Sequence, residues 1–177
     1  GIMLAGVGVF SMFSLKAVLL HLYSHAMIKF VLFFMAGTII QEYGTRNMMR
    51  IHGMLIDVPQ TATFWLTGML GILGLPPFGL FFSKFNILTA MFKSGHYIAG
   101  SLLVVLLVGV LIGILYHGMR MLSDKAKSRK PIGDLLQPID ILVLVLLLLA
   151  TVVVGVGFEN FGWLNRLLSQ AVMIIGG

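Results

Sequence analysis

The sequence predicts an all-α membrane protein, a polytopic bundle of transmembrane helices with one broken helix. Hydrophobic residues make up 59% of its 177 residues and charged residues only 10%, whereas soluble domains carry about 25% charged residues. The mean hydropathy is +1.04, and several apolar runs approach the ~20 residues of a transmembrane helix. Because such a chain cannot cover itself with polar side chains in water, we expect one transmembrane bundle over residues 1–177.

The chain opens on a short apolar segment followed by a long one. Residues 1–13 are too few to span a bilayer, so we expect the end of a helix there. Residues 14–40 form the first full span. Since Gly1 already lies inside an apolar run, we expect the chain to be a fragment of a longer protein or one piece of a split subunit.

A proline pair interrupts the next apolar region. Residues 61–75 and 81–92 are apolar but short, and Pro76, Pro77 and Gly79 lie between them. Adjacent prolines remove two backbone donors and disfavour helix in the preceding residue. Irregular backbone at membrane depth is tolerated where it lines a cavity, so we expect a broken helix, counted here as two short spans.

Two strongly apolar runs complete the expected set of about five spans. They cover residues 97–122 and 138–157, and the most polar stretch of the chain, 123–137, joins them. Residues 158–177 mix polar and apolar side chains, so we expect an amphipathic tail at the membrane interface.

The charges of the connecting segments predict an orientation. With 61–75 and 81–92 counted as separate crossings, segments 41–60 and 123–137 fall on opposite sides of the membrane. Segment 123–137 is the richer in lysine and arginine, and such segments stay in the cytoplasm. We therefore expect a multi-pass protein of the cell inner (cytoplasmic) membrane, with 123–137 in the cytoplasm and 41–60 outside.

Three ionisable residues lie inside the first full span. His21, His25 and Lys29 follow one another at intervals of four residues, which places them along one side of a helix. A charge at the bilayer centre costs roughly 2.5–3.5 kcal/mol, histidine titrates near neutral pH, and burial makes an amine easier to deprotonate. The pattern predicts a proton-translocating element. The alternative is structural: Lys29 would pair with a carboxylate of a neighbouring subunit, and the histidines would bind backbone carbonyls.

A second deep charge follows the proline break. Lys84 has mostly apolar neighbours, and a helix break beside a charge often marks an ion pathway in transporters. The alternative for Lys84 is snorkelling to the interface. His117, near the end of the run 97–122, is a candidate for proton entry or an ordinary interface residue.

Several chemistries are disfavoured. The chain has no cysteine, so it offers no disulfide and no thiolate ligands for iron–sulfur clusters or zinc. It has no phosphate-binding loop, dinucleotide fingerprint or HExxH motif, and His21 and His25 lack the further ligands of a metal site. We expect no cofactor and no catalytic site. The net charge of +6 is better explained by topology and lipid headgroups than by nucleic acid.

Two segments resemble a known family. The segment from His21 to Gly37, HLYSHAMIKFVLFFMAG, is similar to the H-x3-H-x3-K-x2-LF-x2-AG element of antiporter-like subunits. These subunits occur in respiratory complex I, multi-subunit sodium/proton antiporters and energy-converting hydrogenases. The segment LPPFGLFFSKFNIL at 75–88 resembles the broken helix of these subunits, most of all the hydrogenase-associated members.

The resemblance implies roles for particular residues and for the chain. It matches Lys29, His21 and His25 to the family's central lysine and its two histidines, and Lys84 to the outer charged residue. Complete members have two inverted halves, of which this chain resembles the C-terminal one.

The function expected from residues and resemblance together is a proton-translocating membrane subunit of a redox-driven ion-pumping complex, of hydrogenase or complex I type. It would be a non-catalytic subunit. Its partners would be other membrane subunits, peripheral redox subunits and lipids, and its ion would be the proton or sodium. A structural membrane anchor and a sodium/proton antiporter module are the alternatives.

Overall fold

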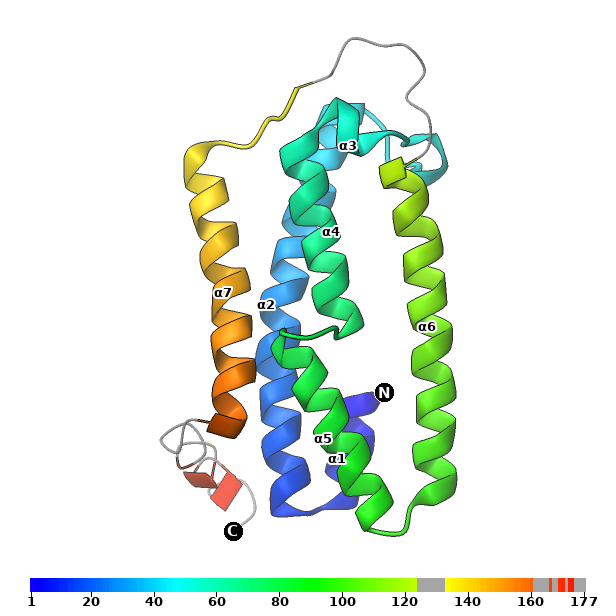
Figure 1. The fold of residues 1–177 in the computed structure, drawn as a ribbon, viewed down its shortest axis with the longest axis vertical. Helices are drawn as coiled ribbons and strands as arrows, with labels where there is room; N and C mark the ends of the chain where they lie inside the picture. The colour runs from blue at the N-terminus through cyan, green and yellow to red at the C-terminus, as the bar shows by residue number, and fades with distance from the viewer. Residues whose placement is uncertain (124–132, 161–165, 167–168, 171, 174–177) are drawn as a thin grey trace.

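The computed structural model describes residues 1–123, 133–160, 166, 169–170 and 172–173. Within these residues the secondary structure is helical, and the helices form an elongated bundle (Figure 1). The elements are α1 (Ile2–Val9), α2 (Met12–Tyr43), a 3-10 turn η1 (Met48–Arg50), α3 (Met54–Asp57), α4 (Pro59–Leu73), α5 (Gly79–Lys93), α6 (Tyr97–Ser123) and α7 (Pro138–Asn160).

Helix α2 runs the length of the bundle and organises its packing. Its 32 residues extend about 48 Å at 1.5 Å per residue, and α1, α4, α5 and α7 pack against it. Helices α2, α6 and α7 are each long and apolar enough to cross a membrane. The all-α membrane fold predicted from composition is therefore confirmed.

Helices α4 and α5 are the two halves of one discontinuous crossing. Each has 15 residues, about 22 Å, which is less than the ~30 Å of a hydrocarbon core. They follow one another along the bundle instead of folding back, with the break near its middle (Figure 1). The broken helix expected from Pro76, Pro77 and Gly79 is present, but its halves make one crossing instead of two.

This single crossing changes the relation between the polar segments. The stretch 133–135 lies against the end of the bundle that holds α3 and the start of α4: the Gly133 amide donates to the Asp57 carbonyl at 3.1 Å, and the Leu135 amide donates to Glu42 Oε1 at 3.1 Å. Figure 1 shows the α5–α6 turn at the opposite end.

The expectation that 41–60 and 123–137 lie on opposite sides of the membrane is therefore wrong for the described residues, because 133–135 lies at the same end of the bundle as 41–60. The sequence-based topology assumed that the chain turns back at the proline pair, and so counted two membrane crossings where the structure has one. Of the expected tail 158–177, residues 161–165, 167–168, 171 and 174–177 lie outside the described residues.

Small residues set the closest helix contacts. A Cβ on Gly155 of α7 would lie 2.6 Å from the Gly79 Cα at the start of α5, so the two backbones touch there. Helix α6 stands further from the bundle, and its most apolar window is only 6% buried. Near its loop end it approaches α4, where Gly118 faces the Met69 side chain.

Candidate functional site

A hydrogen bond between α2 and α5 joins the two elements that carry the candidate residues. His21 is 3% exposed, and its Nδ1 lies 2.9 Å from Ser83 Oγ. The Ser83 hydroxyl also donates to the Leu80 carbonyl at 3.0 Å. A hydroxyl has only one hydrogen, so with that hydrogen on Leu80, His21 donates from Nδ1 and keeps Nε2 as an acceptor.

His25 continues the line one turn along α2. The two imidazole rings are stacked, with centroids 5.6 Å apart and planes 18° from parallel. His25 is half-buried. The four-residue spacing thus brings both rings to one side of the helix.

Lys29 points away from the described bundle. Its side chain is exposed, and its Nζ lies 5.9 Å from the centroid of the Phe33 ring. Four residues on an α-helix turn about 400°, so each step of the pattern drifts about 40° around the helix. The drift explains why His21 is buried, His25 half-buried and Lys29 exposed. Lys29 nevertheless sits near the middle of α2, 17 residues after Met12 and 14 before Tyr43.

Lys84 bridges the two halves of the broken crossing. Its Nζ donates to the carbonyls of Ile72 and Leu73, each at 3.0 Å. These carbonyls belong to the last turn of α4, where acceptors lack helical partners and the helix dipole favours a cation. Gly74 ends α4 with φ +75°, and a Cβ there would lie 3.2 Å from Lys84 Nζ. Gly74 therefore leaves room for the amine, a role that sequence reasoning missed.

Sequence spacing and two contacts relate these residues to one another. His25 lies four residues before Lys29 on α2, the His21 ring stacks on His25, and His21 contacts Ser83, the residue before Lys84. The line thus runs from Lys29, on the outer face of α2, through the histidine pair to Lys84 at the helix break. The arrangement thus brings two imidazole groups and an ammonium group to the contact between α2 and α5.

The break itself has an exposed part and a buried part. Pro76 and Pro77 are exposed, whereas Gly79 is buried. A Cβ on Gly79 would overlap Ser24 Oγ of α2, so a side chain there would push α5 away from α2. The Ser24 hydroxyl is buried and makes no hydrogen bond with the described residues. The sequence offered no signal for its contact with Gly79.

Lys84 also borders a cavity of about 170 Å³ between the broken helix and α6. Apart from Lys84 its lining is apolar and includes Ile72, Leu107 and Leu111. The Lys84 amine is thus the charged group of this lining, and it also donates to the carbonyls at the end of α4.

His117 belongs to a different region. It is exposed on α6, and its ring meets Tyr116 edge to face, with centroids 5.2 Å apart. It lines a separate cavity of about 710 Å³. The contacts of the described residues do not join His117 to the histidines of α2.

Sequence reasoning also missed a carboxylate cluster at the loop end. Glu42 Oε1 accepts hydrogen bonds from the Thr61 hydroxyl at 2.8 Å and from the Leu135 amide. Asp134 accepts from the Thr61 amide at 2.8 Å, and Asp57 accepts from the Tyr43 hydroxyl at 3.3 Å. The bonds from the Leu135 amide to Glu42 and from the Thr61 amide to Asp134 hold 133–135 against α2 and α4.

Comparison with known proteins identifies the family. Residues 1–113 match the model of the family described as "NADH:quinone oxidoreductase/Mrp antiporter, TM". This chain belongs to that family. It is thus an antiporter-like membrane chain of complex I or Mrp type, as its two motifs predicted, whereas the likeness to hydrogenase-associated members stays a prediction.

Three relatives illustrate the similarity. The chain is 39% identical over 85 residues, 48% of its length, to one of the Na(+)/H(+) antiporter subunits of Alkalihalophilus pseudofirmus. It is 33% identical over 105 residues, 59% of its length, to an NADH-quinone oxidoreductase subunit of Desulforudis audaxviator. It is 28% identical over 97% of its length to one of the Na(+)/H(+) antiporter subunits of Bacillus subtilis. These matches cover 11%, 21% and 34% of the relatives' own lengths, so the chain spans a minor part of each.

Proposed function

We propose that this chain translocates protons as part of an antiporter-like membrane unit, along the line formed by Lys29, His25, His21 and Lys84. The observation that carries the proposal is that the stacked pair of His21 and His25 is joined to α5 through Ser83, the residue that precedes Lys84. A line of proton-binding groups from an outer helix face to a helix break suits transfer better than a static anchor.

The transfer would be driven by charge repulsion. A proton arriving at Lys29 raises the positive charge beside His25, and charges a few ångströms apart interact strongly in a medium of low dielectric constant. The repulsion favours movement of a proton from the histidine pair toward Lys84. When Lys84 gives up a proton, it loses part of its hold on the α4 carbonyls, which couples proton release to the helix break.

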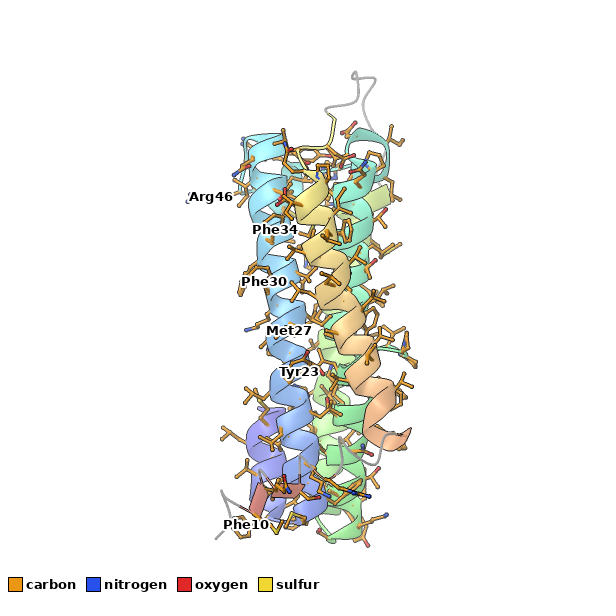
Figure 2. All side chains as sticks on the ribbon, turned by 90° about the vertical axis from the view of Figure 1, so that its left-hand side faces the viewer. Phe10, Tyr23, Met27, Phe30, Phe34 and Arg46 are labelled. Carbon is orange, nitrogen blue, oxygen red and sulfur yellow. The ribbon has the colours of Figure 1, made fainter. Side chains whose placement is uncertain are left out.

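The exposed position of Lys29 calls for other membrane subunits. Its face of α2 also exposes Phe30 and Phe33, which are 52% and 70% accessible, and Figure 2 shows Phe30 and Phe34 along the side of α2. An ammonium group facing hydrocarbon is costly, so we expect another membrane segment to cover this face with polar groups. Peripheral redox subunits of hydrogenase or complex I type would supply the driving force.

The corrected topology gives a new orientation. The described part of 123–137 lies at the same bundle end as 41–60. That end carries Arg46, Arg50 and Arg120, and segment 123–137 is itself rich in lysine and arginine, whereas Lys16 and Lys93 belong to the other end, at the start of α2 and the end of α5. The positive-inside rule then places both segments in the cytoplasm. Lys84 would release protons toward the α5–α6 turn and the outside of the inner membrane.

A sodium/proton antiporter module is the second candidate. Relatives named as Na(+)/H(+) antiporter subunits support it, one of them over nearly the whole chain. Lysine and histidine do not bind sodium, so the proton half of such an exchange would use the same line.

The test is proton pumping by inverted membrane vesicles that contain the complete complex, with Lys29→Ala or Lys84→Ala in this chain. Lys93→Ala is the matched control, because Lys93 is exposed at the end of α5 beside the Phe13 ring. We expect the first two variants to assemble but lose most of the pH gradient, and the control to keep it. Normal gradients in both would favour the anchor. A gradient that depends on added sodium would favour the antiporter module.

A further inference from the structure

A second cavity lies between α2, α4 and α6 and shares Ile72 and Val110 with the lining of the cavity beside Lys84. Its volume is about 710 Å³ and it is lined by apolar, sulfur-containing and aromatic side chains, among them Met48, Met49, Trp65, Met69 and Ile114. Methionine side chains adapt to flexible apolar ligands, and pockets of about 300–1,000 Å³ are typical of ligand sites.

The cavity has the depth of one membrane leaflet. Along α6 its lining runs from Val110 to Gly118, eight residues or about 12 Å. Half of a ~30 Å hydrocarbon core is about 15 Å. Its upper wall is the turn η1, at the loop end of the bundle, and its lower wall reaches Ile72 near the helix break. A chain entering at the loop end would thus reach the middle of the membrane.

The mouth of the cavity is basic. Arg120 on α6 is half-buried, and its Nη1 contacts the Met49 sulfur at 3.6 Å. Arg50 is exposed in η1, which packs against α6. In the part of the chain that the structure describes, neither guanidinium forms an ion pair. Two cations that no described carboxylate pairs, at the membrane interface, favour an anion there.

We propose that this groove binds an anionic phospholipid, with one acyl chain between α4 and α6 and its phosphate at Arg120 and Arg50. The apolar lining and leaflet depth fit an acyl chain, and the arginines match a headgroup with net negative charge. The acyl chain of a zwitterionic lipid would also fit the apolar lining, but its headgroup has no net negative charge to balance the two arginines. The bound lipid fills the gap between α6 and the broken helix and so supports the position of α6.

The test uses the chain's own fluorescence. The sequence has two tryptophans, Trp65 and Trp163, so Trp163→Phe leaves Trp65, which lines the groove, as the sole emitter. The full chain is reconstituted in phosphatidylcholine vesicles containing either brominated phosphatidylglycerol or brominated phosphatidylcholine at equal mole fraction. We expect phosphatidylglycerol to quench Trp65 at a several-fold lower mole fraction. Arg120→Gln should reduce this preference about fivefold, from the ~1 kcal/mol that one basic residue contributes at an anionic surface.

A pair of glycine variants tests the groove itself. A Cβ on Gly113, which lines the groove, meets no atom within 4 Å, and the same holds for Gly109 one turn away, which does not line it. Gly113→Leu should therefore fill the groove without backbone clash and abolish preferential quenching, whereas Gly109→Leu should leave it unchanged. Equal quenching by the two lipids, an unchanged preference in Arg120→Gln or Gly113→Leu, or no quenching by either lipid would overturn the proposal.

Discussion

Replacing Ser83 by alanine isolates the contact between the two helices that carry the proton line. His21 is buried, and Ser83 Oγ is the hydrogen-bond partner of its Nδ1 at 2.9 Å. The variant leaves a buried imidazole N–H without an acceptor, which costs about 1–3 kcal/mol. It also removes the hydroxyl whose rotation would let His21 exchange its donor nitrogen. We expect both lower stability and slower proton transfer.

Thr89→Ala is the control for this substitution. Thr89 lies on the same helix, and its hydroxyl donates to the Phe85 carbonyl at 2.8 Å, much as Ser83 donates to Leu80. Among the described residues it has no hydrogen bond to a histidine. Stability is measured by thermal unfolding in detergent, and transfer by the initial rate of acidification in inverted vesicles containing the complete complex.

The expected result is a free energy of unfolding lower by about 1–3 kcal/mol in Ser83→Ala, with a slower initial rate, while Thr89→Ala stays within about 0.5 kcal/mol. If the two variants behave alike in both assays, the hydrogen bond between His21 and Ser83 contributes nothing and the reasoning fails.

Two further predictions concern packing and topology. Gly155→Ala should destabilise the bundle by about 1–3 kcal/mol in the same unfolding assay, because its Cβ would meet the Gly79 backbone at 2.6 Å; a loss no larger than that of a helix-surface glycine substitution would contradict this contact. Since the chain has no cysteine, single cysteines can report sidedness: Arg46→Cys and Leu135→Cys should react with a membrane-impermeant maleimide from the same side, and Ser94→Cys from the other. Labelling of Arg46→Cys and Leu135→Cys from opposite sides would contradict the single crossing and support two separate crossings by 61–75 and 81–92.

Local chemistry made the broken helix predictable. Pro76 and Pro77 cannot continue a helix, whatever surrounds them. Whether the chain reverses or continues after a break depends on what its second half packs against. Here Gly79 and Ile87 are buried in the bundle, so α5 continues along α2. That packing is a tertiary property, which explains why the loops were assigned to opposite sides.

Part of the candidate site could likewise be predicted from the sequence, and part depends on the tertiary structure. The spacing of His21, His25 and Lys29 predicted a shared side of the helix, but a four-residue repeat drifts by about 40° per step. The exposure of Lys29 follows from that drift together with the positions of the neighbouring helices. The partners of Lys84, which are carbonyls at the end of α4, could not be read from the sequence, because backbone acceptors become available only where the helix ends.

Composition, apolar run length and the proline pair were enough to determine a helical membrane bundle with a discontinuous crossing, since each acts through solvation or through backbone sterics within a few residues. The tertiary structure alone decided which end of the bundle holds each loop, which hydroxyl meets His21 and which carbonyls hold Lys84. Those outcomes depend on how helices separated by tens of residues fit together, and close fit between side chains and backbones has no local signature.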